Sequence, residues 1–103
     1  MIKYEFKKVK TIVELTVSGH ANYKKHGEDI VCASVSTALI LSANLIERMG
    51  YIKHIELEVN DGYFYLKVHQ SSEVVEQVLI NLVETLIELE QQYPKYIKNQ
   101  KEG

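Results

Sequence analysis

The 103-residue sequence is poor in several residue types, and each scarcity excludes a class of protein. It has one cysteine, Cys32, so neither an internal disulfide nor a zinc site of several thiolates can form, and a reducing cytoplasm is the expected compartment. It also has one proline, five glycines and no tryptophan, while 46% of the residues are hydrophobic and 25% are charged. This composition excludes collagen-like and disordered chains and is typical of one globular domain.

Positive charge and long apolar runs are also scarce. Twelve Lys and Arg residues stand against fourteen Asp and Glu residues, and Arg48 is the only arginine. Because affinity for phosphates comes mainly from clustered positive charge, we expect no direct nucleic-acid partner. The longest uncharged run, 30–46, is shorter than the roughly 20 residues of a membrane span, and the N-terminus has no apolar signal-peptide core, so we expect no membrane association.

Alternating apolar and polar residues predict two β-hairpins. The first pairs residues 2–7 with 13–18 through a short Lys/Val turn. The second pairs 55–60 with 64–68, and Asp61-Gly62 between them supplies residues that tolerate positive φ. Each strand keeps one apolar face, which indicates a sheet covered on one side.

An amphipathic helix is predicted after the second hairpin. From Ser71 onwards, Val and Leu residues recur at three- and four-residue steps opposite a row of glutamates. The Tyr93-Pro94 step should end this helix, and the polar tail that follows, 98–103, should fray.

A second helix is predicted between the hairpins, from about Ile30 to Met49, with Asp29 as its N-cap and Gly50 at its end. Most of its length carries no charge, which indicates burial on more than one side, within the fold or in a subunit interface. The expected fold is α+β, in the order β-β-α-β-β-α, with a mostly antiparallel sheet covered by two helices and residues 1–103 as a single domain.

Residues 19–36 gather the groups that can carry chemistry, among them the only cysteine and two of the four histidines. With Asp29 as the N-cap, Cys32 is the third helical residue, where free N–H groups and the helix dipole stabilise a thiolate. His20 ends a strand after Gly19, and the chain between is long enough to fold back and bring the imidazole beside the thiol. This arrangement makes a Cys/His dyad geometrically easy.

Each of these residues also has a structural interpretation. A lone cysteine such as Cys32 at the start of an uncharged helix is commonly a small buried hydrophobic residue. His20 serves equally well as a turn residue bonded to backbone, Asp29 as a helix cap alone, and His26 as a solvated loop residue beside two lysines. Composition alone does not decide between the two interpretations.

Two motifs in this segment resemble the ribosomal-processing cysteine protease family, known as Prp. They are Gly19-His20-Ala21 and Gly27-x-Asp29-Ile30-Val31-Cys32-Ala33-x-Val35-Ser36. The resemblance covers essentially the whole chain in length and element order, and its specificity lies in residues 19–36. It implies that His20 and Cys32 form the catalytic pair, with Asp29 and Ser36 as supporting residues. Ser34 stands where the family often has Ala or Gly, and no catalytic group is lost by that difference.

The resemblance further implies a small homodimeric endopeptidase of the bacterial cytoplasm. Its substrate would be the precursor of the large-subunit ribosomal protein L-twenty-seven, from which it removes an N-terminal extension that ends in a short apolar, aromatic stretch before a small residue. The partners expected are therefore this peptide and a second copy of the chain.

The expected mechanism is attack of Cys32 on the peptide carbonyl, with His20 as its base. Backbone N–H groups at the helix start are expected to hold the oxyanion. Residues 21–28 are expected to close over the substrate as a lid that begins at Ala21, is hinged by Gly19 and Gly27 and offers Tyr23 as an apolar contact.

Two other interpretations compete with the protease. In one, the protein is a non-catalytic ribosome-associated or assembly factor, residues 19–36 form a docking loop, and Cys32 is replaceable. In the other, His20, His26, Cys32 and Asp29 hold a metal, but their spacing matches no standard zinc pattern, so we expect neither metal nor cofactor. His54 and His69 lie in or beside strand patterns and are expected to be structural or surface residues.

Overall fold

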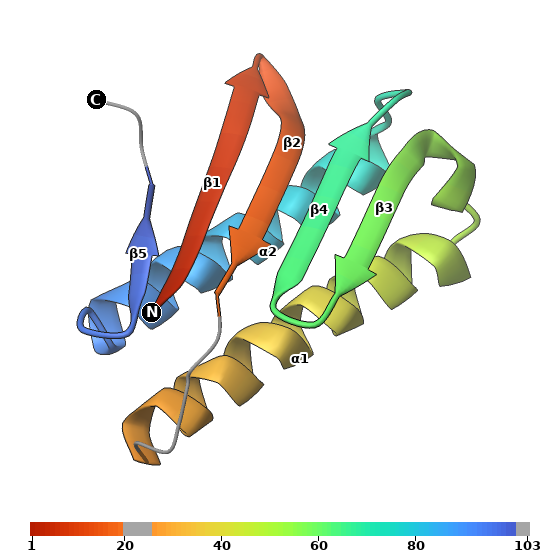
Figure 1. Ribbon diagram of the computed structural model, residues 1–103. Coiled ribbons are helices and arrows are strands. Elements are labelled where there is room, and N and C mark those ends of the chain that lie inside the picture. Colours follow the sequence, from red (N-terminus) through yellow and green to blue (C-terminus); the bar gives the residue numbers. More distant parts are fainter. Residues whose placement is uncertain (20–25, 101–103) are drawn as a thin grey trace.

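The computed structural model describes residues 1–19 and 26–100, and only the backbone of residues 26–29. Its elements follow the predicted order, with one short helix and one short strand in addition (Figure 1). They are β1 (Ile2–Val9), β2 (Thr11–Ser18), α1 (His26–Arg48), the 3-10 helix η1 (Ile52–His54), β3 (Ile55–Asn60), β4 (Tyr63–Val68), α2 (Glu73–Gln92) and β5 (Ile97–Asn99).

The strands form one mixed sheet in the order β3-β4-β2-β1-β5. Neighbouring strands are antiparallel except that β5 runs parallel to β1. The register places Val17 of β2 between Tyr4 of β1 and Phe64 of β4, so apolar side chains align in rows across one face of the sheet. The two predicted hairpins are thus joined side by side through β2 and β4.

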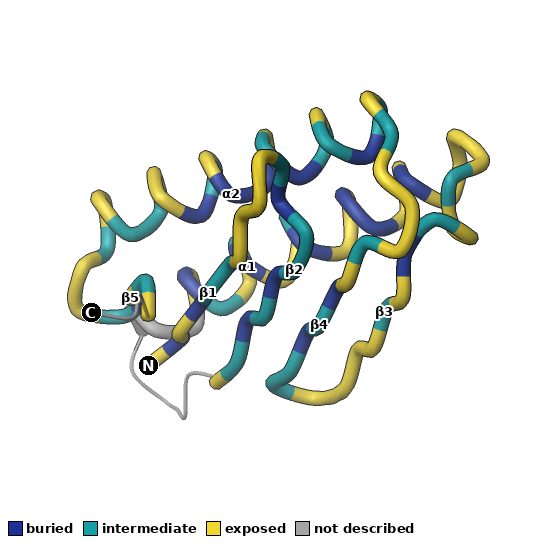
Figure 2. Tube along the Cα trace, turned by 90° about the horizontal axis from the view of Figure 1, so that it is seen from above, coloured by how far each residue is buried: buried dark blue, intermediate teal, exposed yellow. Residues whose placement is uncertain are grey.

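Both helices lie on the apolar face of the sheet, so the molecule has two layers (Figures 1 and 2). α2 packs against α1 and contacts β2 and β5. Figure 2 shows that the buried residues of each helix face the strands and that the exposed residues lie on the outer side. The expected α+β fold, with a mostly antiparallel sheet covered by two helices, is confirmed.

α2 begins and ends where the sequence predicts. Ser72 is its N-cap, and the Ser72 hydroxyl accepts a hydrogen bond of 3.1 Å from the backbone N–H of Val75. The helix ends at Gln92, directly before the Tyr93-Pro94 step. Its apolar stripe is buried and consists of Val75, Leu79, Leu82, Val83 and Leu86.

α1 is apolar on two sides, but only one of them is buried within a single copy of the chain. The buried stripe consists of Val31, Val35, Leu39, Ala43 and Ile46. On the outer side, Leu41 is 67% exposed, Leu45 42% and Met49 49%. A single copy of the chain therefore does not cover the uncharged helix completely.

The apolar length of α1 has a structural explanation. The segment Ile30–Arg48 is long and apolar enough, by length and composition, to cross a membrane, a property that core helices of soluble proteins share. In this fold Val31 and Ile46, near its two ends, are both fully buried against the sheet and α2. The core alone thus accounts for about half of the apolar residues of the helix.

Three local expectations are wrong. α1 begins at His26 rather than after Asp29, so Asp29 lies inside the first turn and is not the N-cap. Residues 26–28 consequently belong to a helix and not to a loop. Residues Lys98 and Asn99 of the tail do not fray, because they pair with β1 as part of β5. The strand β5 was not predictable from alternation, since it is only three residues long.

Candidate active site

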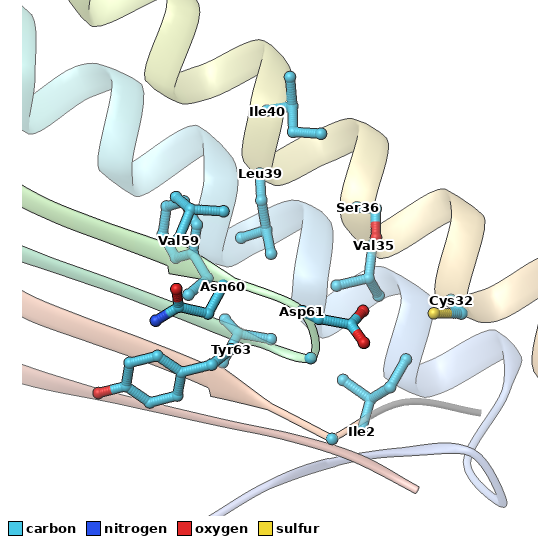
Figure 3. Close-up of a pocket in the computed structure, with 14 residues that line it drawn as sticks. Ile2, Cys32, Val35, Ser36, Leu39, Ile40, Val59, Asn60, Asp61 and Tyr63 are labelled. Atoms are coloured by element: carbon cyan, nitrogen blue, oxygen red, sulfur yellow. The ribbon is translucent and has the colours of Figure 1, made fainter. Parts of the chain in front are cut away.

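A cavity of about 140 Å³ opens between the first half of α1 and the turn that joins β3 to β4. Figure 3 shows side chains from α1, from the N-terminal strand and from the β3–β4 hairpin around this pocket. The walls are mostly apolar and include Ile2, Val17, Val35, Leu39, Val59 and Phe64. Such a pocket fits one apolar side chain of a peptide.

Cys32 lies at the edge of the pocket, and its sulfur is directed toward the cavity (Figure 3). The thiol is free and only partly buried, although part of the side chain packs against the core. The alternative interpretation, in which Cys32 is a small buried hydrophobic residue, is therefore not what the structure shows. A partly exposed thiol beside an apolar pocket can reach a peptide bound there.

The helical position of Cys32 differs from the expected one. Because α1 begins at His26, Cys32 is in the second turn and not the third helical residue. The unpaired N–H groups of a helix and the effect of its dipole are confined to the first turn, so the backbone around Cys32 supplies neither the predicted thiolate stabilisation nor the predicted oxyanion donors.

Gly19 fixes the end of β2 at the same pocket. It lines the cavity together with Cys32, and its N–H donates a hydrogen bond of 2.9 Å to the carbonyl of Gly62 in the β3–β4 turn. Its φ is +99°, and a Cβ on this residue would collide with the backbone carbonyl of Met1. Glycine is required here for its backbone conformation and for close packing, and this is the residue to which His20 is directly bonded.

Ser36 also lines the pocket, four residues after Cys32 and therefore on the same side of α1. Its side chain is exposed, so its hydroxyl is accessible to a ligand in the cavity. Ser34 does not line the pocket, and its hydroxyl instead donates to the carbonyl of Ile30 at 2.9 Å. The departure from the family pattern at Ser34 thus leaves the pocket walls unchanged.

Several of the expected site residues lie outside the described part of the chain. They are His20, Ala21 and Tyr23, together with the side chain of Asp29. Of the expected lid, residues 26–28, including Gly27, form the first turn of α1, and residues 21–25 lie outside the described residues.

The contribution of the β3–β4 hairpin to the site was not predicted from the sequence. Asn60, Asp61 and Gly62 all line the pocket, although they follow Cys32 by almost thirty positions in the sequence. The Asp61-Gly62 pair correctly indicated a turn, and Gly62 has the positive φ of 73° that such a turn needs. No local pattern could show that this turn packs beside α1, because the contact depends on the arrangement of the whole sheet.

The two remaining histidines lie at the other end of the hairpin. His54 Nδ1 donates to the carbonyl of Gln70 at 3.2 Å, and His69 Nε2 is 3.2 Å from a carboxylate oxygen of Glu56. These local contacts agree with a structural or surface role. In the part of the chain that the structure describes, no cluster of three potential metal ligands occurs.

Comparison with known proteins assigns the chain to a family. Residues 1–98 match the family model described as cysteine protease Prp. The chain belongs to the Prp family. This assignment confirms the expected membership in a family of cysteine proteases.

Individual relatives agree with the assignment. The ribosomal processing cysteine protease Prp of Bacillus subtilis is 33% identical over 63 residues, which are 60% of this chain and 56% of that protein. The match therefore spans less than two thirds of the length of this relative. Prp of Staphylococcus aureus is 27% identical over 89 residues, which are 84% of each chain.

Solved structures of Prp share the fold. The S. aureus protease in complex with a covalently linked product peptide has a TM-score of 0.81 and 25% identity, over 96% of this chain and 97% of that one. The same protease with a substrate peptide has a TM-score of 0.82 at 22% identity, over 99% of this chain and 100% of that one, and supports the fold alone.

Proposed function

We propose that this protein is a cytoplasmic endopeptidase that removes the N-terminal extension of ribosomal protein L-twenty-seven, and that residues 1–103 act as one Prp-like domain without a cofactor. The observation that carries the proposal is the accessible thiol of Cys32 at the mouth of an apolar pocket. The membership in the Prp family supplies the reaction class.

The proposed catalytic pair is Cys32 and His20. Because Gly19 lines the same pocket as Cys32, the backbone that carries His20 begins at the edge of the site. An imidazole attached there needs to span only a short distance to the thiol. Cys32 lies in the second turn of α1, so the helix dipole does not activate it, and pairing with His20 takes the place of that activation.

The reaction then follows the chemistry of thiol proteases. The imidazole of His20 takes the proton of Cys32, and the sulfur attacks the carbonyl carbon of the scissile bond to form a tetrahedral intermediate. Collapse of this intermediate expels the amine, which receives the proton from His20. Water then hydrolyses the thioester and releases the N-terminal fragment with a new carboxylate.

The other motif residues have supporting roles in this proposal. The exposed hydroxyl of Ser36, on the pocket wall, contacts the peptide or the reacting carbonyl. Asp29 orients the chain between the two catalytic residues. Ala21 and Tyr23 contact the substrate, and Gly27 allows the chain to enter α1.

The pocket supports the proposed substrate by its size and lining. An engineered protein cavity of roughly 150 Å³ lined by Leu, Ile and Phe holds benzene, and the pocket beside Cys32, at about 140 Å³, is similarly apolar. It therefore accepts one aromatic ring or branched aliphatic side chain. The expected extension of L-twenty-seven has an apolar, aromatic stretch next to the cleaved bond, and one of these side chains would occupy the pocket.

A synthetic peptide that spans the extension junction tests the proposal. We expect His20→Ala and Cys32→Ala each to abolish cleavage, because a nucleophile and its base act as a unit, whereas His26→Ala retains most activity. Circular dichroism of the three variants controls for folding. Cleavage at an unchanged rate by the Cys32→Ala protein would contradict covalent catalysis by Cys32, whereas absence of cleavage by the wild-type protein would favour the non-catalytic assembly factor.

We also propose a homodimer formed through the outer side of α1. Leu41, Leu45 and Met49 recur at four-residue steps and are exposed, and Ile52 of η1, shortly after the helix end, is exposed as well. Monomeric proteins seldom expose a continuous apolar stripe of this kind, and a second copy of α1 would cover it. No nucleic acid and no membrane takes part in the proposed function.

A further inference from the structure

Asp61 gives the pocket a negative charge at its mouth. In the β3–β4 turn its carboxylate projects between Val35 and Cys32, whereas the hydroxyl of Tyr63 points away from the cavity (Figure 3). Among the described residues that line the pocket, Asp61 is the one with a charged side chain. A peptide that enters the cavity beside Cys32 must therefore pass this carboxylate.

The turn that carries Asp61 is held beside the pocket by backbone contacts. Asn60 pairs with Tyr63 across the two-residue turn, and the carbonyl of Gly62 accepts the hydrogen bond from Gly19. The turn is thus attached both to its own hairpin and to the end of β2. A charge held in place by the fold interacts with a bound ligand at no cost in side-chain ordering beyond its own rotamer.

No cation in the described part of the chain pairs with this carboxylate. The ion pairs found there are Lys7 with Glu14 and His69 with Glu56, on other parts of the sheet. Among the described residues, the carboxylate of Asp61 is therefore left without a cationic partner.

We propose that Asp61 is a specificity-determining residue, which favours peptides with a lysine or arginine flanking the aromatic segment bound at the pocket and disfavours an acidic residue there. This inference rests on the proposed peptidase function. Opposite charges a few ångströms apart at a protein surface attract, whereas like charges repel by a similar amount, and both effects weaken as salt rises. The rest of the pocket wall is apolar and cannot discriminate between charges.

A matched peptide series tests the proposal. The peptides share two aromatic residues before a small residue and differ only in carrying Lys, Gln or Glu at each flanking position in turn. For the wild-type protein at low salt we expect kcat/KM for the best Lys peptide to exceed that for the corresponding Glu peptide by about tenfold, which corresponds to about 1.4 kcal/mol. The ratio should fall as salt is added.

Variants of Asp61 test whether this residue causes the preference for Lys over Glu peptides. Asp61→Asn should bring the Lys-to-Glu ratio close to one, and Asp61→Lys should invert it. Asn-Gly is itself a favoured hairpin turn, so Asp61→Asn is expected to fold normally. Glu84→Gln removes an exposed carboxylate of α2 that does not line the pocket, and this control should keep the wild-type ratio.

The possible failures of the two proposals are distinguishable. If the wild-type protein cleaves the Lys, Gln and Glu peptides equally well, or if Asp61→Asn keeps the preference, the role of Asp61 is wrong while the peptidase function stands. If no peptide of the series is cleaved by the wild-type protein, the proposed function is wrong, and the inference about Asp61 fails with it.

Discussion

Gly19 shapes the site through its backbone rather than through a side chain. It follows the last residue of β2, precedes the proposed base His20, and donates a hydrogen bond to the turn that carries Asp61. The sequence places Gly19 directly before His20, and both residues belong to the Gly19-His20-Ala21 motif. The reason for the glycine, a positive φ combined with contact to the carbonyl of Met1, depends on the neighbouring strand and could not be predicted.

Replacement of Gly19 should therefore be more costly than replacement of a glycine that needs only its conformation. Gly50 provides the comparison, because its φ is +88° but nothing lies within 4 Å of an added Cβ. We expect Gly50→Ala to lower the free energy of unfolding by about 1 kcal/mol, the cost of a left-handed conformation for alanine. Gly19→Ala should cost at least about twice as much and reduce peptide cleavage.

Denaturant titration of the two variants measures both changes. Equal destabilisation by Gly19→Ala and Gly50→Ala would show that the contact with Met1 is unimportant.

Cys32 should react in the folded protein. Its sulfur faces an open pocket and is only partly buried, so iodoacetamide should label it under native conditions. Mass spectrometry after brief exposure to iodoacetamide measures the labelled fraction of the protein, and Cys32→Ala serves as the unlabelled control. Labelling that requires denaturant would show that the thiol is inaccessible and would remove the basis for nucleophilic attack.

α1 contributes Cys32, Val35, Ser36, Leu39 and Ile40 to the pocket and has an uncovered apolar stripe on its outer side. The absence of charge between residues 30 and 46 was enough to predict two apolar sides. The first residue of the helix was not predictable, since Asp29 is a good N-cap by type, and the chain instead enters the helix at His26. That shift by one turn changes the chemistry expected of Cys32.

A charge on the outer side of α1 should separate the proposed dimer. Leu41 is the most exposed residue of the stripe, so Leu41→Glu costs little within a single copy but places a carboxylate in the interface. We expect light scattering to give a dimer for the wild-type protein and a monomer for Leu41→Glu at micromolar concentration. Ile87→Glu, on the exposed side of α2, is the matched control and should remain dimeric. A wild-type monomer would contradict the interface.

The carboxylate of Glu90 on α2 links β1 and β5 through two hydrogen bonds. The hydroxyl of the buried Tyr4 donates to Glu90 at 2.7 Å, and the second carboxylate oxygen of Glu90 accepts from the N–H of Asn99 at 3.4 Å. Burial, reinforced by the hydrogen bond to Glu90, raises the pKa of Tyr4 well above its usual value of 10.0. The folded state therefore favours the neutral phenol.

The raised pKa predicts how the Tyr4→Phe variant compares with the wild type at alkaline pH. Because the folded pKa lies above the unfolded one, the stabilisation is fully present below about pH 10 and is lost as the pH rises through the folded value. We expect Tyr4→Phe to be less stable by about 1 to 2 kcal/mol at neutral pH, and the gap to narrow above about pH 10. Urea titrations at several pH values measure the gap. A gap that does not change with pH would contradict the raised pKa of Tyr4 in the folded state.

The arrangement of the whole molecule in a sheet layer and a helix layer was largely predictable from the sequence. The residues that form the site were only partly predictable. Alternation and helical periodicity are local signals, and they predicted both hairpins, both helices and the covered face of the sheet. The pairing of β2 with β4, the parallel strand β5 and the place of Asp61 beside Cys32 depend on contacts between distant segments. The short motifs around His20 and Cys32 nevertheless indicated the reaction class, because thiol chemistry needs few residues.

Cleavage of the complete L-twenty-seven precursor, followed by intact-mass spectrometry, tests the central claim most directly. The wild-type protein should release one N-terminal fragment that ends in the aromatic stretch, while Cys32→Ala, folded to the same extent, should leave the precursor intact. A precursor that stays intact with the wild-type protein, or one that Cys32→Ala cleaves at the same bond and rate, would contradict the account.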